Sequence, residues 1–169
     1  IFTNTRKPSL KITKIDANTG KALAGAVIRI FNLSGSTTVD KTTNADGEIF
    51  LDNLEEGIYT VQEITAPKGY LLNDELHHVE VKAGSNNELV IANTKKPSLT
   101  IKKYDSLTGK PMANVRFEVY RDTLLIGTYD TNATGEILLY DLELGTYTVK
   151  EIAADEGHIV NSTPQSIEI

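Results

Sequence analysis

The chain has 169 residues, of which 40% are hydrophobic and 24% are charged, as in an ordinary folded protein. Its formal net charge of −6 argues against binding to nucleic acid or to an anionic membrane surface, because both need clustered Lys and Arg. The absence of cysteine excludes disulfides and thiolate metal sites. No apolar run approaches the ~20 residues of a transmembrane helix, so we expect no direct membrane insertion.

The chain repeats itself. KPSLKITKIDANTGKALAGAVIRIF at residues 7–31 aligns with KPSLTIKKYDSLTGKPMANVRFEVY at 96–120, and ADGEIFLDNLEEGIYTVQEITAPKGY at 45–70 aligns with ATGEILLYDLELGTYTVKEIAADEGH at 133–158. We therefore predict two homologous domains, residues 8–94 and 95–169. Because NTRKPSL at 4–10 matches NTKKPSL at 93–99, we expect residues 1–7 to be the end of a preceding repeat or a linker.

Each repeat alternates apolar and polar residues over about four to eight positions, interrupted by turn signals such as NADG and PKG. No segment has the pattern of a long helix. This pattern predicts an all-β chain of two tandem antiparallel β-sandwiches, each with about six to eight strands. At the end of the chain SIEI matches HVEV at 78–81, and nothing follows to match KAGSNNELVIAN. The second sandwich is therefore expected to lack its last strand within this chain.

Three polar residues of the first repeat occupy positions that strand parity marks as inward. In LKITKID, Lys14 shares a face with Leu10 and Ile12. In YTVQEI and LVIAN, Glu63 and Asn93 likewise share faces with apolar residues. In a sandwich, these three faces point into the core.

The second repeat has two of these residues. Parity selects Lys103, rather than its neighbour Lys102, and Glu151 as inward-facing. The alternative is that a lysine near a strand end extends to water along its aliphatic stem. The recurrence of a Lys and a Glu at the same positions of both repeats favours inward-facing side chains.

Burying an ammonium and a carboxylate costs several kcal/mol per ion, so stability alone does not explain why they are kept. Burial disfavours both charged forms, which leaves a neutral amine beside a neutral carboxylic acid. The amine is then a nucleophile, and the acid can pass protons. The expected product is an amide between Lys14 Nζ and Asn93 Cγ, with ammonia released.

The patterns ITKID, TGKALAGA, TNADGEIFLDNLEEGIYTVQEITAPKGY and the closing IAN resemble the Cna B-type (prealbumin-like) domains of Gram-positive surface adhesins and pilins. The resemblance covers nearly all of residues 8–93 and, less closely, 97–169. It implies an intramolecular isopeptide bond between Lys14 and Asn93, with Glu63 as the catalytic residue.

By the same resemblance, Lys103 and Glu151 are the crosslinking and catalytic residues of the second repeat, but the asparagine expected on its final strand lies beyond residue 169. Asn161 is not a substitute, because it aligns with a loop residue of the first repeat. We considered that residues 1–4 of another copy add a strand there and bring Asn4 beside Lys103. The simpler alternative is that the sequence ends before that strand.

Together these features predict a structural stalk or pilus-shaft segment of an extracellular, cell-wall-anchored Gram-positive surface protein. No LPxTG-like sorting signal occurs in these residues. The expected partners are neighbouring domains of the same protein or other pilus subunits. We expect self-crosslinking without a cofactor or metal, rather than an enzyme that acts on an external substrate. The alternative function is an adhesin module that binds host matrix proteins.

Overall fold

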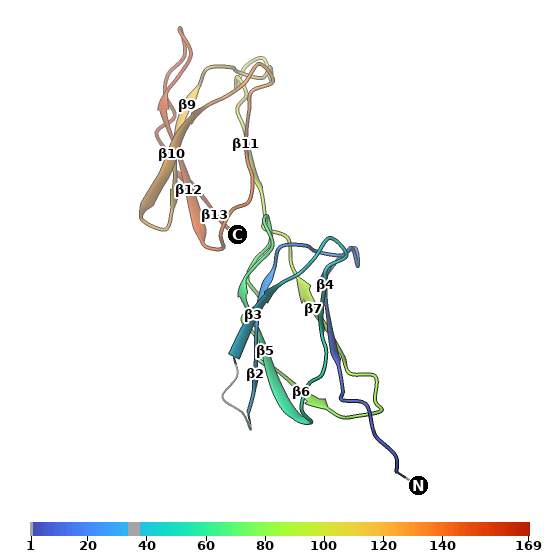
Figure 1. The fold of residues 1–169 in the computed structure, drawn as a ribbon. Helices are drawn as coiled ribbons and strands as arrows, with labels where there is room; N and C mark the ends of the chain where they lie inside the picture. The colour runs from blue at the N-terminus through green and yellow to red at the C-terminus, as the bar shows by residue number, and fades with distance from the viewer. Residues whose placement is uncertain (1, 34–37) are drawn as a thin grey trace. The chain divides into compact units, whose positions relative to one another are not determined.

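The computed structural model describes residues 2–33 and 38–169. Within these residues the regular elements are β-strands, and no α-helix occurs. The chain divides into two compact units, residues 1–95 and 96–169, called unit 1 and unit 2 below. Each unit is a pair of sheets that face each other (Figure 1). The prediction of an all-β chain with two tandem sandwiches is therefore confirmed. Within the described residues, no helix is long and apolar enough to cross a lipid bilayer.

Unit 1 is built from a three-stranded and a four-stranded sheet, in the orders β4-β1-β7 and β3-β2-β5-β6. Its strands are β1 (Leu10–Asp16), β2 (Val27–Asn32), β3 (Thr38–Thr42), β4 (Glu48–Leu51), β5 (Gly57–Thr65), β6 (His77–Val81) and β7 (Glu88–Asn93).

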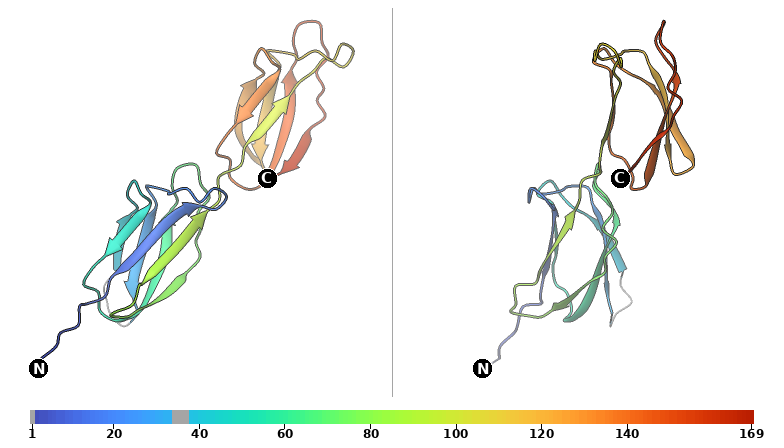
Figure 2. Two further views of the ribbon diagram at one scale, coloured as in Figure 1. Left: turned by 90° about the vertical axis from the view of Figure 1, so that its right-hand side faces the viewer. Right: turned by 180° about the vertical axis from the view of Figure 1, so that it is seen from behind.

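The first and last strands of unit 1 are neighbours and run parallel, as the left view of Figure 2 shows. In their register Lys14 lies opposite Ile91, and Asp16 lies opposite Asn93. Side chains on one face of such a pair project together, so the inward residues of β1 and β7 meet in the core.

Alternate residues of β1 are buried, as its sequence pattern predicts. The core of unit 1 consists mainly of aliphatic side chains from both sheets, and its fully buried members include Leu10, Ile12, Ile28, Val61, Val81 and Ile91. Burial of each such side chain stabilises the fold by about 1.5–3 kcal/mol. Lys14 continues this inward row of β1 directly after Ile12.

Unit 2 repeats this plan over residues 96–169, in sheets of order β10-β9-β12-β13 and β11-β8. Its strands are β8 (Leu99–Lys102), β9 (Arg116–Arg121), β10 (Leu124–Asp130), β11 (Glu136–Leu139), β12 (Thr146–Ala153) and β13 (Gln165–Glu168). β8 pairs with β11 as β1 pairs with β4. Within the described residues, no strand lies on the other edge of β8, where β7 lies in unit 1.

Candidate functional site

Three polar side chains meet in the core of unit 1. Lys14 on β1 and Asn93 on β7 project from neighbouring strands of one sheet, whereas Glu63 on β5 reaches toward them from the facing sheet. The exposed fractions of these residues are 0% for Lys14 and 1% for Glu63 and Asn93. The structure thus brings together the three residues that parity selected in the first repeat.

The Glu63 carboxyl lies between the amine and the amide. Its Oε1 is 3.2 Å from Lys14 Nζ, within ion-pair distance but poorly aligned for a hydrogen bond. Its Oε2 accepts a hydrogen bond of 2.8 Å from Asn93 Nδ2. One oxygen therefore faces an amine nitrogen, and the other faces the amide nitrogen.

Two backbone groups of the segment between β5 and β6 orient this cluster. The Asn73 N–H donates to Glu63 Oε2 at 2.8 Å. The Leu71 carbonyl accepts a hydrogen bond from Asn93 Nδ2 at 2.7 Å. The Asn93 NH2 group donates both hydrogen bonds, one to Glu63 and one to Leu71, and this fixes the orientation of the amide.

Several atoms of the cluster are buried without hydrogen-bond partners in the described structure: Lys14 Nζ, Glu63 Oε1 and Asn93 Oδ1. An unsatisfied buried polar atom costs about 1–3 kcal/mol, and a charged one costs more. Burial lowers the pKa of Lys14 below its ordinary value of 10.5, although the charge of Glu63 partly opposes the shift. The site therefore increases the fraction of Lys14 that is a neutral, nucleophilic amine.

This geometry suits acyl transfer to the amine. Lys14 Nζ is a nucleophile held beside the strand that carries Asn93, whose side-chain carbonyl carbon is an electrophile. The Glu63 carboxyl contacts the attacking nitrogen and the nitrogen that would leave. It can thus take a proton from one nitrogen and give a proton to the other.

A buried carboxylate that the sequence analysis did not single out lies next to this cluster. Asp16 Oδ1 accepts backbone N–H bonds from Asn18 and Thr19, each 2.8 Å long. Its Oδ2 accepts the Tyr70 hydroxyl at 2.8 Å, which ties the segment after β5 to the end of β1. These hydrogen bonds lower the pKa of Asp16 to about 2, and the bond from Thr19 contributes most to the shift.

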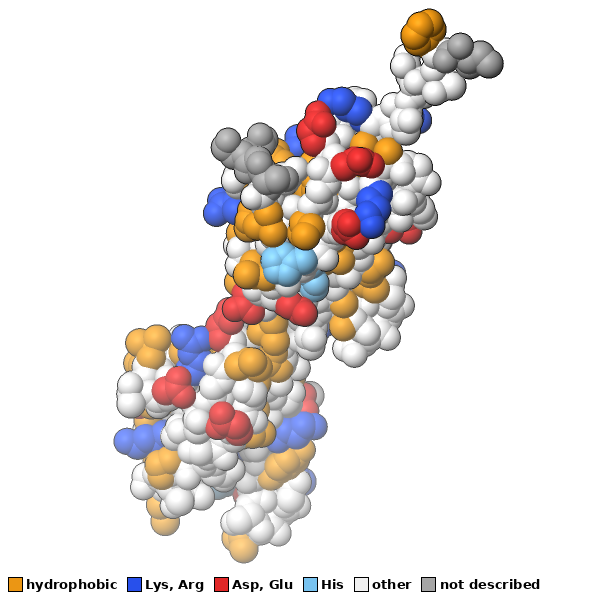
Figure 3. All heavy atoms as spheres, turned by 90° about the horizontal axis from the view of Figure 1, so that it is seen from below, with side chains coloured by type: hydrophobic (Ala, Val, Ile, Leu, Met, Phe, Trp, Pro, Cys, Tyr) orange, Lys and Arg blue, Asp and Glu red, His pale blue; other side chains and the backbone are white. Residues whose placement is uncertain are grey.

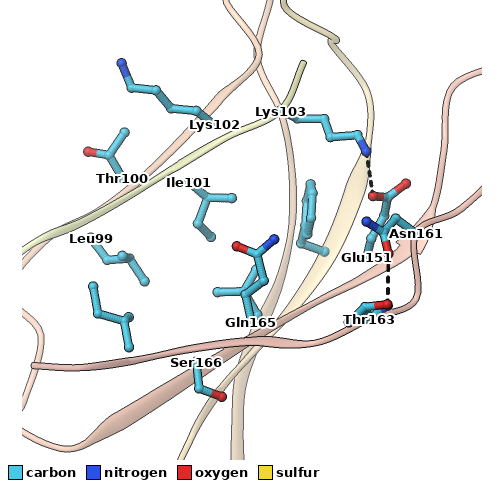
Figure 4. A pocket seen from close by; sticks show the side chains of 13 residues that line it. Leu99, Thr100, Ile101, Lys102, Lys103, Glu151, Asn161, Thr163, Gln165 and Ser166 are labelled. Carbon is cyan, nitrogen blue, oxygen red and sulfur yellow. Dashed lines mark hydrogen bonds and ion pairs between the residues drawn. The ribbon is translucent and has the colours of Figure 1, made fainter. Parts of the chain in front are cut away.

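Unit 2 repeats the lysine and the carboxylate. Lys103 Nζ donates to Glu151 Oε2 at 2.8 Å, and the side chains are 20% and 3% exposed (Figure 4). Lys102 instead points outward and pairs with Glu136 at the surface. Within residues 96–169, no asparagine takes the position that Asn93 has in unit 1, because no strand is paired there.

Two other asparagines were considered in the sequence. Asn161 is exposed in the segment before β13 and lines the same cavity as Lys103 and Glu151. Asn4 is exposed in the segment before β1, outside both clusters. In unit 1 the amine, the carboxyl and the amide are all buried together, whereas in unit 2 the asparagine that lines the cavity is exposed.

Acidic and basic side chains are interspersed on the face drawn in Figure 3. Across residues 2–33 and 38–169, no group of three or more His, Asp or Glu residues could hold a metal ion.

The two-sheet units, with parallel first and last strands in unit 1, define the class of prealbumin-like β-sandwich domains. The chain belongs to the SpaA family of prealbumin-like fold domains, whose model matches residues 8–95 and 97–169.

Solved structures similar to this chain include a protein of Bacillus anthracis and bacterial pilins. The Bacillus anthracis TIE protein is 32% identical with a TM-score of 0.54, over 97% of this chain and 31% of that chain. A streptococcal ancillary pilin shares the fold at 21% identity and a TM-score of 0.56, over 99% of this chain and 60% of that one.

Sequence relatives include the trypsin-resistant surface T6 protein of Streptococcus pyogenes serotype M6, which is 29% identical over 90 residues. The serine-aspartate repeat-containing protein F of Staphylococcus epidermidis is 28% identical over 160 residues. These matches cover 53% and 77% of this chain but only 17% and 9% of the two relatives. The chain thus spans less than a fifth of either protein.

Proposed function

We propose that unit 1 forms an amide bond between Lys14 and Asn93 without an external catalyst. The neutral Lys14 Nζ attacks Asn93 Cγ, a new Nζ–Cγ bond forms, the Cγ–Nδ2 bond breaks, and ammonia leaves. Glu63 carries a proton from the attacking nitrogen to the leaving nitrogen. This reaction occurs once per molecule and consumes no second substrate.

The convergence of Nζ, carboxyl and amide in a closed apolar core is the observation that carries this proposal. Lys14 Nζ and Glu63 Oε1 face each other without a well-aligned hydrogen bond, which supports it, because a buried cluster kept only for stability would satisfy its polar atoms. Formation of the amide removes the amine as a charged group, and with it most of the burial cost.

The crosslink would give the domain a mechanical role. It would join the first and last strands of unit 1, which are parallel neighbours through which tension enters and leaves. We infer that the chain is a stalk or pilus-shaft segment of a cell-wall-anchored Gram-positive surface protein. Its partners are then neighbouring domains of that protein or other pilus subunits.

Intact-mass spectrometry tests the crosslink. The parent chain is expected to weigh one ammonia less than its sequence requires. Lys14→Ala, Glu63→Gln and Asn93→Ala should each have the full mass that their own sequences require. Lys11→Ala, which removes an exposed lysine from the same strand, is the matched control and should keep the deficit. A parent chain of full mass would refute the proposal.

A further inference from the structure

A short segment between β5 and β6 is bonded to the strand of every reactive residue in unit 1. It comprises residues 70–73 and is called the strap below. None of its four side chains is fully buried. Because apolar burial contributes little to its attachment, its hydrogen bonds decide where the strap lies.

The strap holds the chain at Asn93 and at both of its neighbours. Asn73 Nδ2 donates to the carbonyl oxygen of Ala92 at 3.1 Å. The Leu71 N–H donates to the carbonyl oxygen of Thr94 at 2.9 Å. Between these two bonds, the Asn93 amide donates to the Leu71 carbonyl at 2.7 Å. One short segment thus fixes the backbone on each side of Asn93 and its amide group.

The strap is also bonded to the strands that carry the carboxyl and the amine. The Asn73 N–H donates to Glu63 Oε2 at 2.8 Å. The Tyr70 hydroxyl donates at 2.8 Å to Oδ2 of Asp16, which lies two residues after Lys14 on β1. The strap therefore connects the strands of all three reactive residues, and Tyr70 does so through Asp16.

Sheet pairing alone does not bring the amine to the amide. In the parallel register of β1 and β7, Lys14 lies opposite Ile91. Asn93 instead lies opposite Asp16, so the reacting residues are staggered by two positions, roughly 7 Å along the strand. Attack needs the two atoms about 3–3.5 Å apart and aligned. The reaction therefore depends on how the Asn93 side chain is held.

We propose that Tyr70 and Asp16 are positioning residues for the amide bond of unit 1. Their hydrogen bond fixes the strap, and the strap holds the Asn93 amide in the geometry that Lys14 attacks. Neither Tyr70 nor Asp16 exchanges a proton with the reacting groups. This inference rests on the proposed function of unit 1, which supplies the reaction that the two residues accelerate.

Asp16 is a rigid anchor for the strap. It is 5% exposed, and its Oδ1 accepts the backbone N–H groups of Asn18 and Thr19, each at 2.8 Å. These donors favour the charged carboxylate, and a charged acceptor strengthens the bond from the Tyr70 hydroxyl. Loss of that hydroxyl leaves the Asp16 loop in place, because its two backbone donors remain.

Unit 2 shows that a different donor can take the place of Tyr70. His158 aligns with Tyr70, and His158 Nε2 lies 3.0 Å from Asp105 Oδ2. Asp105 aligns with Asp16, and its Oδ1 likewise accepts two backbone N–H groups. The contact with the aspartate is thus present in both units although the residue type differs. This points to the hydrogen bond, rather than the tyrosine ring, as the feature that matters.

The rate of ammonia loss by the newly made full chain tests the proposal. Chains from a short pulse of cell-free synthesis are sampled over time, and intact mass gives the crosslinked fraction. Tyr70→Phe and Asp16→Ala should each slow crosslinking by about 10-fold or more, since a misplacement of about 1 Å costs roughly 100-fold. The double variant should be no slower than Asp16→Ala alone, because both changes break the same hydrogen bond.

Tyr70→His is the variant that should recover most of the parent rate. It returns a donor to Asp16, as His158 does for Asp105 in unit 2. Tyr59→Phe is the matched control and should react at the parent rate. It also removes a tyrosine hydroxyl from unit 1, but that hydroxyl donates to the Glu55 carbonyl before β5.

Folding is measured separately from the reaction. Each variant is also made with Lys14→Met, which removes the nucleophile and leaves the bonds of the strap in place, and its NMR spectrum shows whether unit 1 is folded. A positioning defect lowers the rate in a chain that folds. Tyr70→Phe keeps both the ring and the Asp16 loop, so it decides the question if Asp16→Ala does not fold.

Two results would overturn the positioning role and leave the crosslink itself in place. One is a folded Tyr70→Phe chain that reacts at the parent rate. The other is a Tyr70→His chain that folds but reacts as slowly as Tyr70→Phe, because the ring would then matter rather than the hydrogen bond. A parent chain that keeps its full mass would instead refute the proposed function, and the positioning role with it.

Discussion

Lys14 and Glu63 belong to facing sheets of unit 1, yet Lys14 Nζ lies 3.2 Å from Glu63 Oε1 in a fully buried setting. The contact crosses the core at the level where β1 and β7 bring Lys14 and Asn93 onto one face. A stability role alone would leave two ions buried at a cost of several kcal/mol each. The proposed conversion of Lys14 and Asn93 to an amide would explain why the core holds this pair.

Loss of the crosslink should lower the stability of unit 1. Without Asn93 the chain between Lys14 and position 93 cannot be closed into a loop. The unfolded chain then gains conformational entropy, which predicts a loss of ~4 to 5 kcal/mol in the free energy of unfolding. Denaturant unfolding measures it. Lys11→Ala, which breaks only the exposed pair with Glu48, should change stability by less than about 1 kcal/mol. Equal stability of parent and Asn93→Ala would contradict this prediction.

Tension should distinguish the two units. When a single molecule is pulled from its ends, residues 15–92 of the parent should not extend, because force would pass through the Lys14–Asn93 bond. In Lys14→Ala the same segment should add on the order of 250 Å of length, at roughly 3.3 Å per residue. Unit 2 should unfold in both molecules and serves as the internal control. An extra unit 1 extension in the crosslinked parent would argue against the mechanical role.

Gly47 determines how closely the turn before β4 approaches Lys14. Its φ is +71°, and an added Cβ would lie 2.6 Å from the Lys14 carbonyl oxygen and 2.8 Å from the Leu23 nitrogen. Gly47→Ala should therefore displace β1 and reduce the fraction of crosslinked molecules in the mass spectrum. The left-handed backbone alone costs an alanine about 1–3 kcal/mol.

Gly20 provides the matched control for that substitution. Its φ of +69° is similar, but an added Cβ would meet nothing within 4 Å. Gly20→Ala should thus carry the backbone cost without the collision, and crosslinking should remain complete. Equal crosslinking and stability in the two variants would show that the approach of Gly47 to Lys14 has no role.

Asp16 should make unit 1 sensitive to acid. Hydrogen bonds from Thr19, Tyr70 and Asn18 lower the pKa of Asp16 from 3.8 to about 2. A lowered carboxyl pKa contributes stability that is complete above about pH 4 and is lost as the pH falls toward 2. Tyr70→Phe removes one donor, so it should reduce stability near neutral pH and flatten this acid dependence.

The pH dependence is best measured in the Asn93→Ala background, where unfolding does not involve a crosslinked loop. Tyr59→Phe is the control, because the Tyr59 hydroxyl donates to a backbone carbonyl, that of Glu55, rather than to Asp16. It should leave the slope of stability against pH between 4 and 2 unchanged. The same slope with and without Tyr70→Phe in the Asn93→Ala background would remove Tyr70 as a cause of the shift in the pKa of Asp16.

Strand parity was sufficient to predict which residues face the core. Lys14, Glu63 and Asn93 lie on strands whose side chains alternate with period two, and the buried row of β1 continues through the lysine. The internal repeat also predicted that Lys103 and Glu151 occupy the positions of Lys14 and Glu63, and the two side chains meet in unit 2. Both inferences depend on regular backbone geometry, for which sequence is a good guide.

The surroundings of the site could not be predicted in this way. Asn73 and Leu71 contribute backbone groups from an irregular segment, and side-chain patterns carry no information on where such groups point. The Asp16–Tyr70 bond joins residues far apart in sequence. The second repeat contained one signal for this bond. Asp105 aligns with Asp16 and His158 aligns with Tyr70, and these two residues also form a hydrogen bond.

The most direct measurement is tandem mass spectrometry of a tryptic digest of the folded parent chain. An acylated Lys14 resists trypsin, so the account predicts one branched peptide in which residues 12–21 are joined to residues 83–95 through Lys14 and Asn93, with one ammonia missing. Glu63→Gln should yield three separate peptides, residues 12–14, 15–21 and 83–95, because trypsin then cleaves after Lys14. Recovery of those separate, unmodified peptides from the parent chain would contradict the account.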